Sequence, residues 1–277
     1  MRMLNHFVRI GSALLCVALT TGCNPPVPEP TATPTPEPTA TATATLVPTD
    51  TPEPTATPTE TPKPTATATP NVKATAAARV TATVEAALPK INDVLEDYGF
   101  STDRGRLGYM HGPIKITVDT YDENNHQTDF PDVKLHNFVL HTDVTWNTSS
   151  GLAGCYLVYR ADGDLYKGKQ YRMIMIRLQG LPLWGVGAFS NGRGDALLDD
   201  VYLPDGRLED TQGSTNKIVI VAEDTKFTFY ANGERLGTVV NSKYGEGAIA
   251  FGALQESGKT TCEYENIWVW SLDEEAQ

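Results

Sequence analysis

Residues 217–240 read KIVIVAEDTKFTFYANGERLGTVV, and this stretch decides the fold. β-Branched and aromatic side chains fill three short runs, and Asn232-Gly233 separates the last two. Asn-Gly is typical of a type I′ turn, whose two central residues both need a positive φ. The pattern therefore predicts a β-hairpin centred on this dipeptide. The strands expected in this stretch are Lys217–Ala222, Lys226–Tyr230 and Arg235–Val240.

The same signal recurs on both sides of the hairpin, from about residue 106 to residue 271. Short runs of strand-forming residues alternate with clusters of Gly, Asn, Asp and Pro, which is typical of strands joined by turns. Many short strands at regular spacing indicate an all-β sandwich or barrel. Further strands are expected at Pro113–Thr120, Asn137–Trp146, Gly154–Ala161, Gln170–Leu178, Ala248–Ala253 and Thr261–Ser271.

In their order, these segments resemble a concanavalin A-like (laminin G-like) jelly-roll over residues 105–272. The resemblance is carried by NFVLHTDVTW, GLAGCYLVYRADGD, QYRM, the hairpin stretch, YGEGAIAFGAL and TTCEYENIWVW. The layout is similar in particular to bacterial domains of the 3-keto-disaccharide hydrolase type. The resemblance implies an all-β, two-sheet antiparallel jelly-roll sandwich, which we expect at residues 100–277. It leaves the activity open, because the superfamily includes lectins, glycan-binding modules, protein-binding modules and glycanases.

The N-terminus resembles the signal peptide of a bacterial lipoprotein, at residues 1–23. Arg2 and Arg9 form a positively charged region before an apolar run, IGSALLCVAL, that is too short to span a bilayer as a helix. Gly-Cys at the end of this segment matches a lipobox, although Thr20 stands where Leu is preferred. The resemblance implies cleavage before Cys23, lipidation of Cys23 and an extracytoplasmic, membrane-anchored protein. An ordinary secretory signal is the alternative.

Two further segments precede the expected sandwich. Residues 24–71 are rich in Pro and Thr, so they cannot bury enough apolar surface to fold and are expected to form a disordered, extended stalk. Residues 72–99 are expected to be helical, with Pro89 ending or restarting the helix. The apolar spacing of Ile91, Val94, Leu95 and Tyr98 predicts a short helix at residues 90–98 that packs on the sandwich.

Charge excludes one class of partner. The formal net charge is −12, and no Lys/Arg cluster interrupts the acidic folded half, so nucleic-acid binding is not expected. The first hypothesis is a surface-anchored binding module for a carbohydrate or another cell-surface ligand, without catalytic activity. A glycoside hydrolase of the same superfamily and a protein-binding adhesion or structural module are the alternatives.

No catalytic motif supports the hydrolase alternative. Glycanases of this fold carry a Glu-x-Asp-x-x-Glu pattern on one strand, and it is absent from the sequence. Glu263 and Glu265 share a strand face by their spacing, but Ile267 and Val269 are expected to continue that face. No Gly-x-Ser-x-Gly nucleophile elbow occurs.

Candidate binding residues come from Gly180–Gly213, a Gly- and Asp-rich stretch interpreted as one long loop. Long loops in compact domains often carry function. A surface loop that packs its own aromatic side chains is the alternative. The ligand-binding candidates are Trp184, Phe189, Asn191, Asp195 and Tyr202.

The expected jelly-roll suggests two further structural roles. Cys155 and Cys262 lie in strands that could be neighbours and could form a disulfide, with two buried free thiols as the alternative. Side chains alternate between the two faces of a strand, so Trp268 and Trp270 are expected to share a face with Cys262 and Tyr264. We therefore expect both Trp residues in the core.

Metal and cofactor requirements are not expected. The five His residues lack zinc spacing, and no EF-hand pattern occurs. Calcium is the one alternative, because loop carboxylates and carbonyls bind it in this superfamily. Its candidate ligands are Asp122, Glu123, Asn124 and Asn125.

Overall fold

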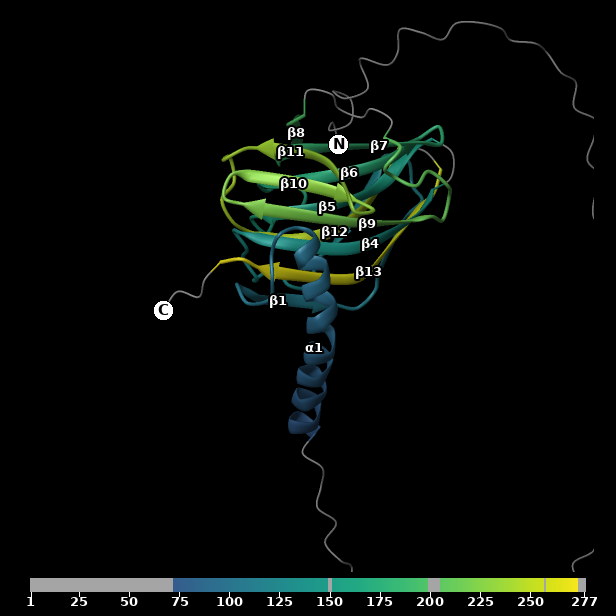
Figure 1. Ribbon diagram of the computed structural model, residues 1–277. Coiled ribbons are helices and arrows are strands. Elements are labelled where there is room, and N and C mark those ends of the chain that lie inside the picture. Colours follow the sequence, from purple (N-terminus) through teal and green to yellow (C-terminus); the bar gives the residue numbers. More distant parts are fainter. Residues whose placement is uncertain (1–71, 149–150, 199–204, 257, 274–277) are drawn as a thin grey trace, which may run out of the picture.

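The computed structural model describes residues 72–148, 151–198, 205–256 and 258–273 (Figure 1). The predicted signal peptide at residues 1–23, the lipidation site Cys23 and the stalk at residues 24–71 lie outside the described residues. Within the described ranges, no helix is long and apolar enough to cross a bilayer.

Two antiparallel sheets face each other, as expected for a jelly-roll sandwich. In the first sheet the order is β1-β13-β4-β9-β10-β11, and β2 pairs with β13 as well. Its strands are β1 (Arg106–His111), β2 (Ile114–Val118), β4 (Phe138–Thr148), β9 (Thr215–Glu223), β10 (Lys226–Ala231), β11 (Glu234–Val240) and β13 (Thr260–Ser271).

In the second sheet the order is β3-β12-β5-β6-β7-β8. Strands distant in sequence lie side by side here, because β12 enters between β3 and β5 just as β13 enters between β1 and β4 in the first sheet. The strands are β3 (Glu123–Gln127), β5 (Leu152–Ala161), β6 (Gln170–Leu178), β7 (Leu181–Ser190), β8 (Arg193–Ala196) and β12 (Ala248–Gln255). The predicted all-β sandwich is therefore confirmed.

The predicted hairpin is confirmed in detail. Strands β10 and β11 pair from Lys226–Val240 to Ala231–Glu234. Asn232 and Gly233 have φ values of 52° and 85°, as a type I′ turn requires.

Inward-facing side chains of both sheets form the main core. Large rings meet at its centre, where Tyr159 lies 5.3 Å from Tyr171 and 5.2 Å from Phe227, measured between ring centroids. Cys155 on β5 and Cys262 on β13 form a disulfide, so a covalent bond joins the two sheets inside this core.

A bulge in β13 corrects the expected alternation. The pairing register with β4 shifts between Glu265 and Trp268, and Asn266 has a φ of 50°. One extra residue turns the rest of the strand over. Cys262 therefore faces the main core, whereas Trp268 and Trp270 lie on the other face of the sheet in a second buried cluster. The expected burial of both Trp residues is confirmed, and the expectation of a shared face is wrong. For the same reason Ile267 and Val269 point into the main core and do not continue the face of the two glutamates.

The C-terminal part of one helix, α1 (Val72–Asp97), packs on the outer face of the first sheet, and the rest projects beyond the edge of the sheet (Figure 1). Ile91 and Leu95 are buried against Trp268 and Trp270, which confirms the predicted packing of residues 90–98. The expected break at Pro89 is wrong, because the helix runs through it. Pro89 is exposed, so water can reach the carbonyl that its missing N–H leaves without a helical partner.

Candidate functional site

The stretch interpreted as one long loop contains two strands. Residues 181–190 form β7, in which Trp184, Val186 and Ala188 face the main core. Gly185 and Gly187 occupy the opposite face, so the alternation of apolar and polar residues that marks a half-buried strand is missing from the sequence. Trp184 is 8 % exposed, and its Nε1 donates to Asp205 Oδ2 at 2.9 Å.

The five predicted ligand residues do not come together. Phe189 is buried on the outer face of the second sheet, opposite to Trp184. Asn191 lies exposed in the β7–β8 turn, and exposed Asp195 forms an ion pair with Lys243 at 3.0 Å. Tyr202 lies outside the described residues. The described members of the set thus offer no shared aromatic surface for a ligand.

A groove lies instead where the exit of α1, the β9–β10 turn and the end of β13 meet. Its volume is about 390 Å³. Phe100 and Leu272 supply apolar surface, and the other side chains and backbone are polar or charged. The lining residues are Gly99, Phe100, Ser101, Arg104, Asn137, Glu223, Asp224 and Leu272.

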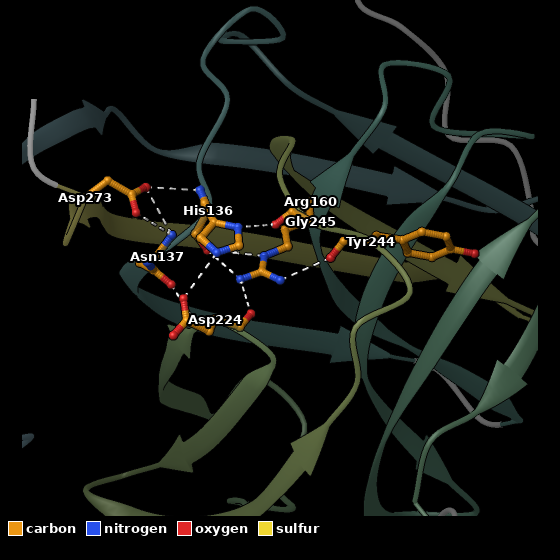
Figure 2. Close-up of polar contacts among 7 residues, drawn as sticks. All are labelled: His136, Asn137, Arg160, Asp224, Tyr244, Gly245 and Asp273. Atoms are coloured by element: carbon orange, nitrogen blue, oxygen red, sulfur yellow. Dashed lines mark hydrogen bonds and ion pairs between the residues drawn. The ribbon is translucent and has the colours of Figure 1, made fainter. Parts of the chain in front are cut away.

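The wall of this groove is held by a buried arginine, as Figure 2 shows. Arg160, 1 % exposed, donates from Nη2 to the carbonyl oxygens of His136 at 2.7 Å and Asp224 at 2.6 Å. Its Nη1 donates to the carbonyl of Tyr244 at 3.0 Å, and the guanidinium lies 4.7 Å from the Phe227 ring centroid. Burial lowers the pKa of Arg160. These bonds tie three chain segments together, so the groove is preorganised.

Asn137 links the same segments from the side of the groove. Its Oδ1 accepts from the backbone N–H of Asp224 at 2.6 Å, and its backbone N–H donates to Asp273 at 3.1 Å (Figure 2). The backbone N–H of Leu272 donates to the Asn137 carbonyl at 2.9 Å. His136 adds a contact between its Nδ1 and the Gly245 carbonyl at 2.7 Å.

The charged groups of the groove are accessible. The Asp224 side chain is 84 % exposed, and Glu223 has only a long contact of 3.9 Å with Lys226. Arg104 is exposed, and no described acidic side chain forms a salt bridge with it. Carboxylates and a guanidinium in the lining of one groove can accept hydrogen bonds from, and donate them to, one polar ligand.

None of the lining residues was predicted from the sequence. They belong to four segments that are far apart in the chain, and each looks like an ordinary turn or strand end. The one local signal is Glu223-Asp224, two consecutive acids at a tight turn.

The predicted calcium ligands point to different partners. Glu123 Oε2 accepts from the backbone N–H groups of Asp119 and Thr120, both at 2.9 Å, and these bonds lower the Glu123 pKa. Asn124 accepts from the Tyr156 hydroxyl, and Asn125 Oδ1 accepts from the His126 backbone at 2.8 Å. Across the described ranges, no three His, Cys, Asp or Glu side chains gather where they could hold a metal ion.

The two glutamates of β13 also have structural neighbours. Glu263 forms an ion pair with Lys115 of β2 at 2.5 Å. Glu265 lies opposite Asp143 of β4 in the register of the sheet. Both alternate with Cys262 and Tyr264, which face the main core, so the two glutamates lie on the outer face of the first sheet, and neither lines the groove.

Solved β-sandwich structures are similar to this chain in fold. A carbohydrate-binding module, CBM66 from Bacillus subtilis, is 17% identical, with 58% of this chain and 97% of that chain covered and a TM-score of 0.44. The β-glucanase of Bacillus licheniformis is 10% identical, with 62% and 94% covered and a TM-score of 0.42. Sheep galectin-11 is 9% identical, with 58% and 98% covered and a TM-score of 0.33.

No family model matches the chain, and no curated protein does. The structural similarities concern the fold alone, so the function has to be inferred from the residues of this chain.

Proposed function

We propose that the sandwich is a non-catalytic carbohydrate-binding module, displayed outside a bacterial cell on a lipid-anchored stalk. The observation that carries the proposal is the groove of about 390 Å³ between α1, the β9–β10 turn and β13. Ligand sites are typically concave, with apolar walls and a few convergent polar groups.

The chemistry of the groove suits a sugar. Sugar rings offer apolar C–H faces, which pack on aromatic rings such as that of Phe100. Their hydroxyls both donate and accept, so they can bind the carboxylates of Glu223 and Asp224 together with the guanidinium of Arg104. The Arg160 network fixes the surrounding backbone, which lowers the ordering cost of binding.

Two features favour binding over hydrolysis. Hydrolysis needs a pair of carboxyl groups placed on either side of the glycosidic bond. Glu223 and Asp224 are instead consecutive in the chain, and the general acid of such enzymes normally lies in apolar surroundings, whereas Asp224 is open to water.

The lipobox-like sequence around Cys23 supports the anchoring part of the proposal. The resemblance to 3-keto-disaccharide hydrolase-type domains supports a glycan ligand.

Affinity electrophoresis of the chain without residues 1–23, through a panel of soluble polysaccharides, tests this function. We expect retardation by at least one neutral polymer, lost in Phe100→Ala and weakened in Arg104→Ala. Matched controls are Tyr121→Ala, an aromatic residue that is 75 % exposed and outside the groove, and Arg193→Ala on β8. Retardation that persists in both groove variants would place the ligand elsewhere, and shortening of a polymer would establish hydrolysis.

A further inference from the structure

A second buried arginine differs from Arg160 in what surrounds it. Arg172 of β6 is 3 % exposed on the outer face of the second sheet. Its guanidinium contacts two rings, 5.0 Å from the Tyr156 centroid and 4.6 Å from the Phe189 centroid. No acidic side chain in the described ranges forms a salt bridge with it. A buried charge without a counter-charge is strongly destabilising.

The guanidinium is also incompletely hydrogen-bonded. Its Nη2 donates to the Leu165 carbonyl at 2.9 Å, whereas its buried Nε has no partner. Gln170 donates from Nε2 to the same carbonyl at 2.8 Å, and its buried Oε1 has no partner either. Arg160, in contrast, makes four hydrogen bonds to three carbonyls. Both arginines are buried, so burial alone does not explain why the Nε–H of Arg172 has no acceptor.

The two donors Nε and Nη2 form one edge of the guanidinium fork, which matches the two oxygens of a carboxylate or sulfate. The Leu165 carbonyl supplies a single oxygen to that edge. A two-oxygen anion in its place would bond both donors and would supply the missing negative charge.

Leu165 belongs to a loop, residues 162–169, that is closed largely by its own bonds. The backbone N–H of Asp162 donates to the Lys169 carbonyl at 3.0 Å, and Asp164 Oδ1 accepts from the backbone of Tyr166 and Lys167 at 3.0 and 2.9 Å. The backbone N–H of Asn191 also donates to the Lys167 carbonyl at 2.6 Å, and the Leu165 side chain is buried, so the loop stays anchored while the Leu165 peptide turns its carbonyl away from Arg172.

The same loop presents an exposed ring, which is connected to Arg172 through His126 and Tyr156. Tyr166 is 57 % exposed, and its ring centroid lies 4.1 Å from that of His126, whose Nδ1 contacts the Tyr156 hydroxyl at 3.3 Å. An exposed ring that is two side chains away from a buried cation suits an extended ligand with a flat apolar face and an attached anion. An acidic sugar has both.

We infer that Arg172 is the counter-charge for the carboxylate or sulfate of an acidic saccharide, which packs on Tyr166. This site is separate from the groove, and the inference takes from the proposed function only that the ligand is a saccharide.

The chain without residues 1–23 is titrated calorimetrically with an oligogalacturonate, its fully methyl-esterified form and a sulfated galactan oligomer. We expect the acidic oligogalacturonate to bind on the order of thirtyfold or more tightly than the ester, since a buried charge pair is lost in the ester. Arg172→Gln should abolish this preference, and Arg193→Gln, an exposed arginine, should keep it. Tyr166→Ala should weaken the acidic ligand several-fold and provides a surface variant if Arg172→Gln fails to fold.

Each outcome separates the two proposals. Equal binding of acid and ester by the unmodified chain, or a preference that survives in folded Arg172→Gln, would overturn the Arg172 site while leaving the groove untouched. If acidic oligomers bind equally well to Phe100→Ala and no neutral polymer binds, the Arg172 site is supported and the proposal that the groove binds a sugar is contradicted. Sulfated and carboxylated oligomers binding alike would assign oxyanion recognition in general, and binding of the carboxylated one alone would assign uronic acids.

Discussion

Cys155 of β5 and Cys262 of β13 form a disulfide inside the core, and this bond cross-links the two sheets. Both residues are fully buried, and 107 positions separate them in the chain. A cross-link between such distant positions removes much of the conformational freedom of the unfolded chain.

The first prediction follows from this link. Replacing both Cys155 and Cys262 with Ala should lower the free energy of unfolding by about 2–5 kcal/mol. Chemical denaturation of the chain without residues 1–23, with and without reductant, measures this. Reductant should destabilise the parent and leave the double variant unchanged. Two reactive thiols in the unfolded, unreduced parent would contradict the disulfide.

Trp184 is predicted to matter for stability and not for ligand binding. Its indole N–H is bonded to Asp205 inside the sandwich, so Trp184→Phe leaves a largely buried carboxylate with one donor fewer. The expected loss is about 1–3 kcal/mol in the free energy of unfolding. Asp195→Ala, at an exposed position of β8, should change stability by about 0.5 kcal/mol or less. Loss of glycan retardation in Trp184→Phe with unchanged stability would restore this residue as a ligand contact.

The bulge at Asn266 gives a prediction about backbone conformation. Asn266 has a φ of 50°, its Nδ2 donates to Asp143 at 2.5 Å, and its carbonyl contacts His141 Nδ1 at 2.9 Å. Asn266→Val should cost about 1–3 kcal/mol, because β-branched residues are strained at positive φ. Asn266→Gly relieves the backbone and loses only the side-chain bond, so it should cost less. Thermal denaturation compares the two, and equal losses would assign the effect to the side chain.

These residues show why some of the structure was predictable and some was not. The β10–β11 hairpin depends on Asn232-Gly233, two adjacent residues whose conformational preference does not need the rest of the chain. Which side chains of β13 face the core depends on one extra residue in the middle of an unbroken run of strand formers. Counting by alternation does not detect this residue. In β7, Gly185 and Gly187 remove the polar half of the alternation, so a buried strand resembles a loop.

The groove was not predictable for a different reason. Phe100 follows the helix, Asn137 precedes β4, Asp224 lies in a hairpin turn and Leu272 follows β13. Their proximity depends on the crossing of strands that are distant in sequence. The carbonyl groups that bind Arg160 could not be predicted from the sequence either, because every residue has a carbonyl group and residue type does not distinguish them.

The last prediction concerns His126, whose ring lies beside Tyr166 and near Arg172. Burial, and then the positive charge of Arg172, lower the pKa of His126 to about 4. The folded protein therefore takes up this proton at a lower pH than the unfolded chain, whose histidine titrates near 6.5. The contribution of His126 to stability is then complete above about pH 6.5 and is lost as the pH falls toward 4.

NMR titration of the His126 ring measures this pKa directly. Arg172→Gln should raise it, because the nearby positive charge is gone, and His126→Gln should make the stability less sensitive to pH between 6.5 and 4. Saturating oligogalacturonate should also raise the pKa, because an anion at Arg172 cancels the same charge. An oligogalacturonate that binds without moving the His126 titration would place the acidic ligand away from Arg172, whereas a shift in the parent that disappears in Arg172→Gln would place it there.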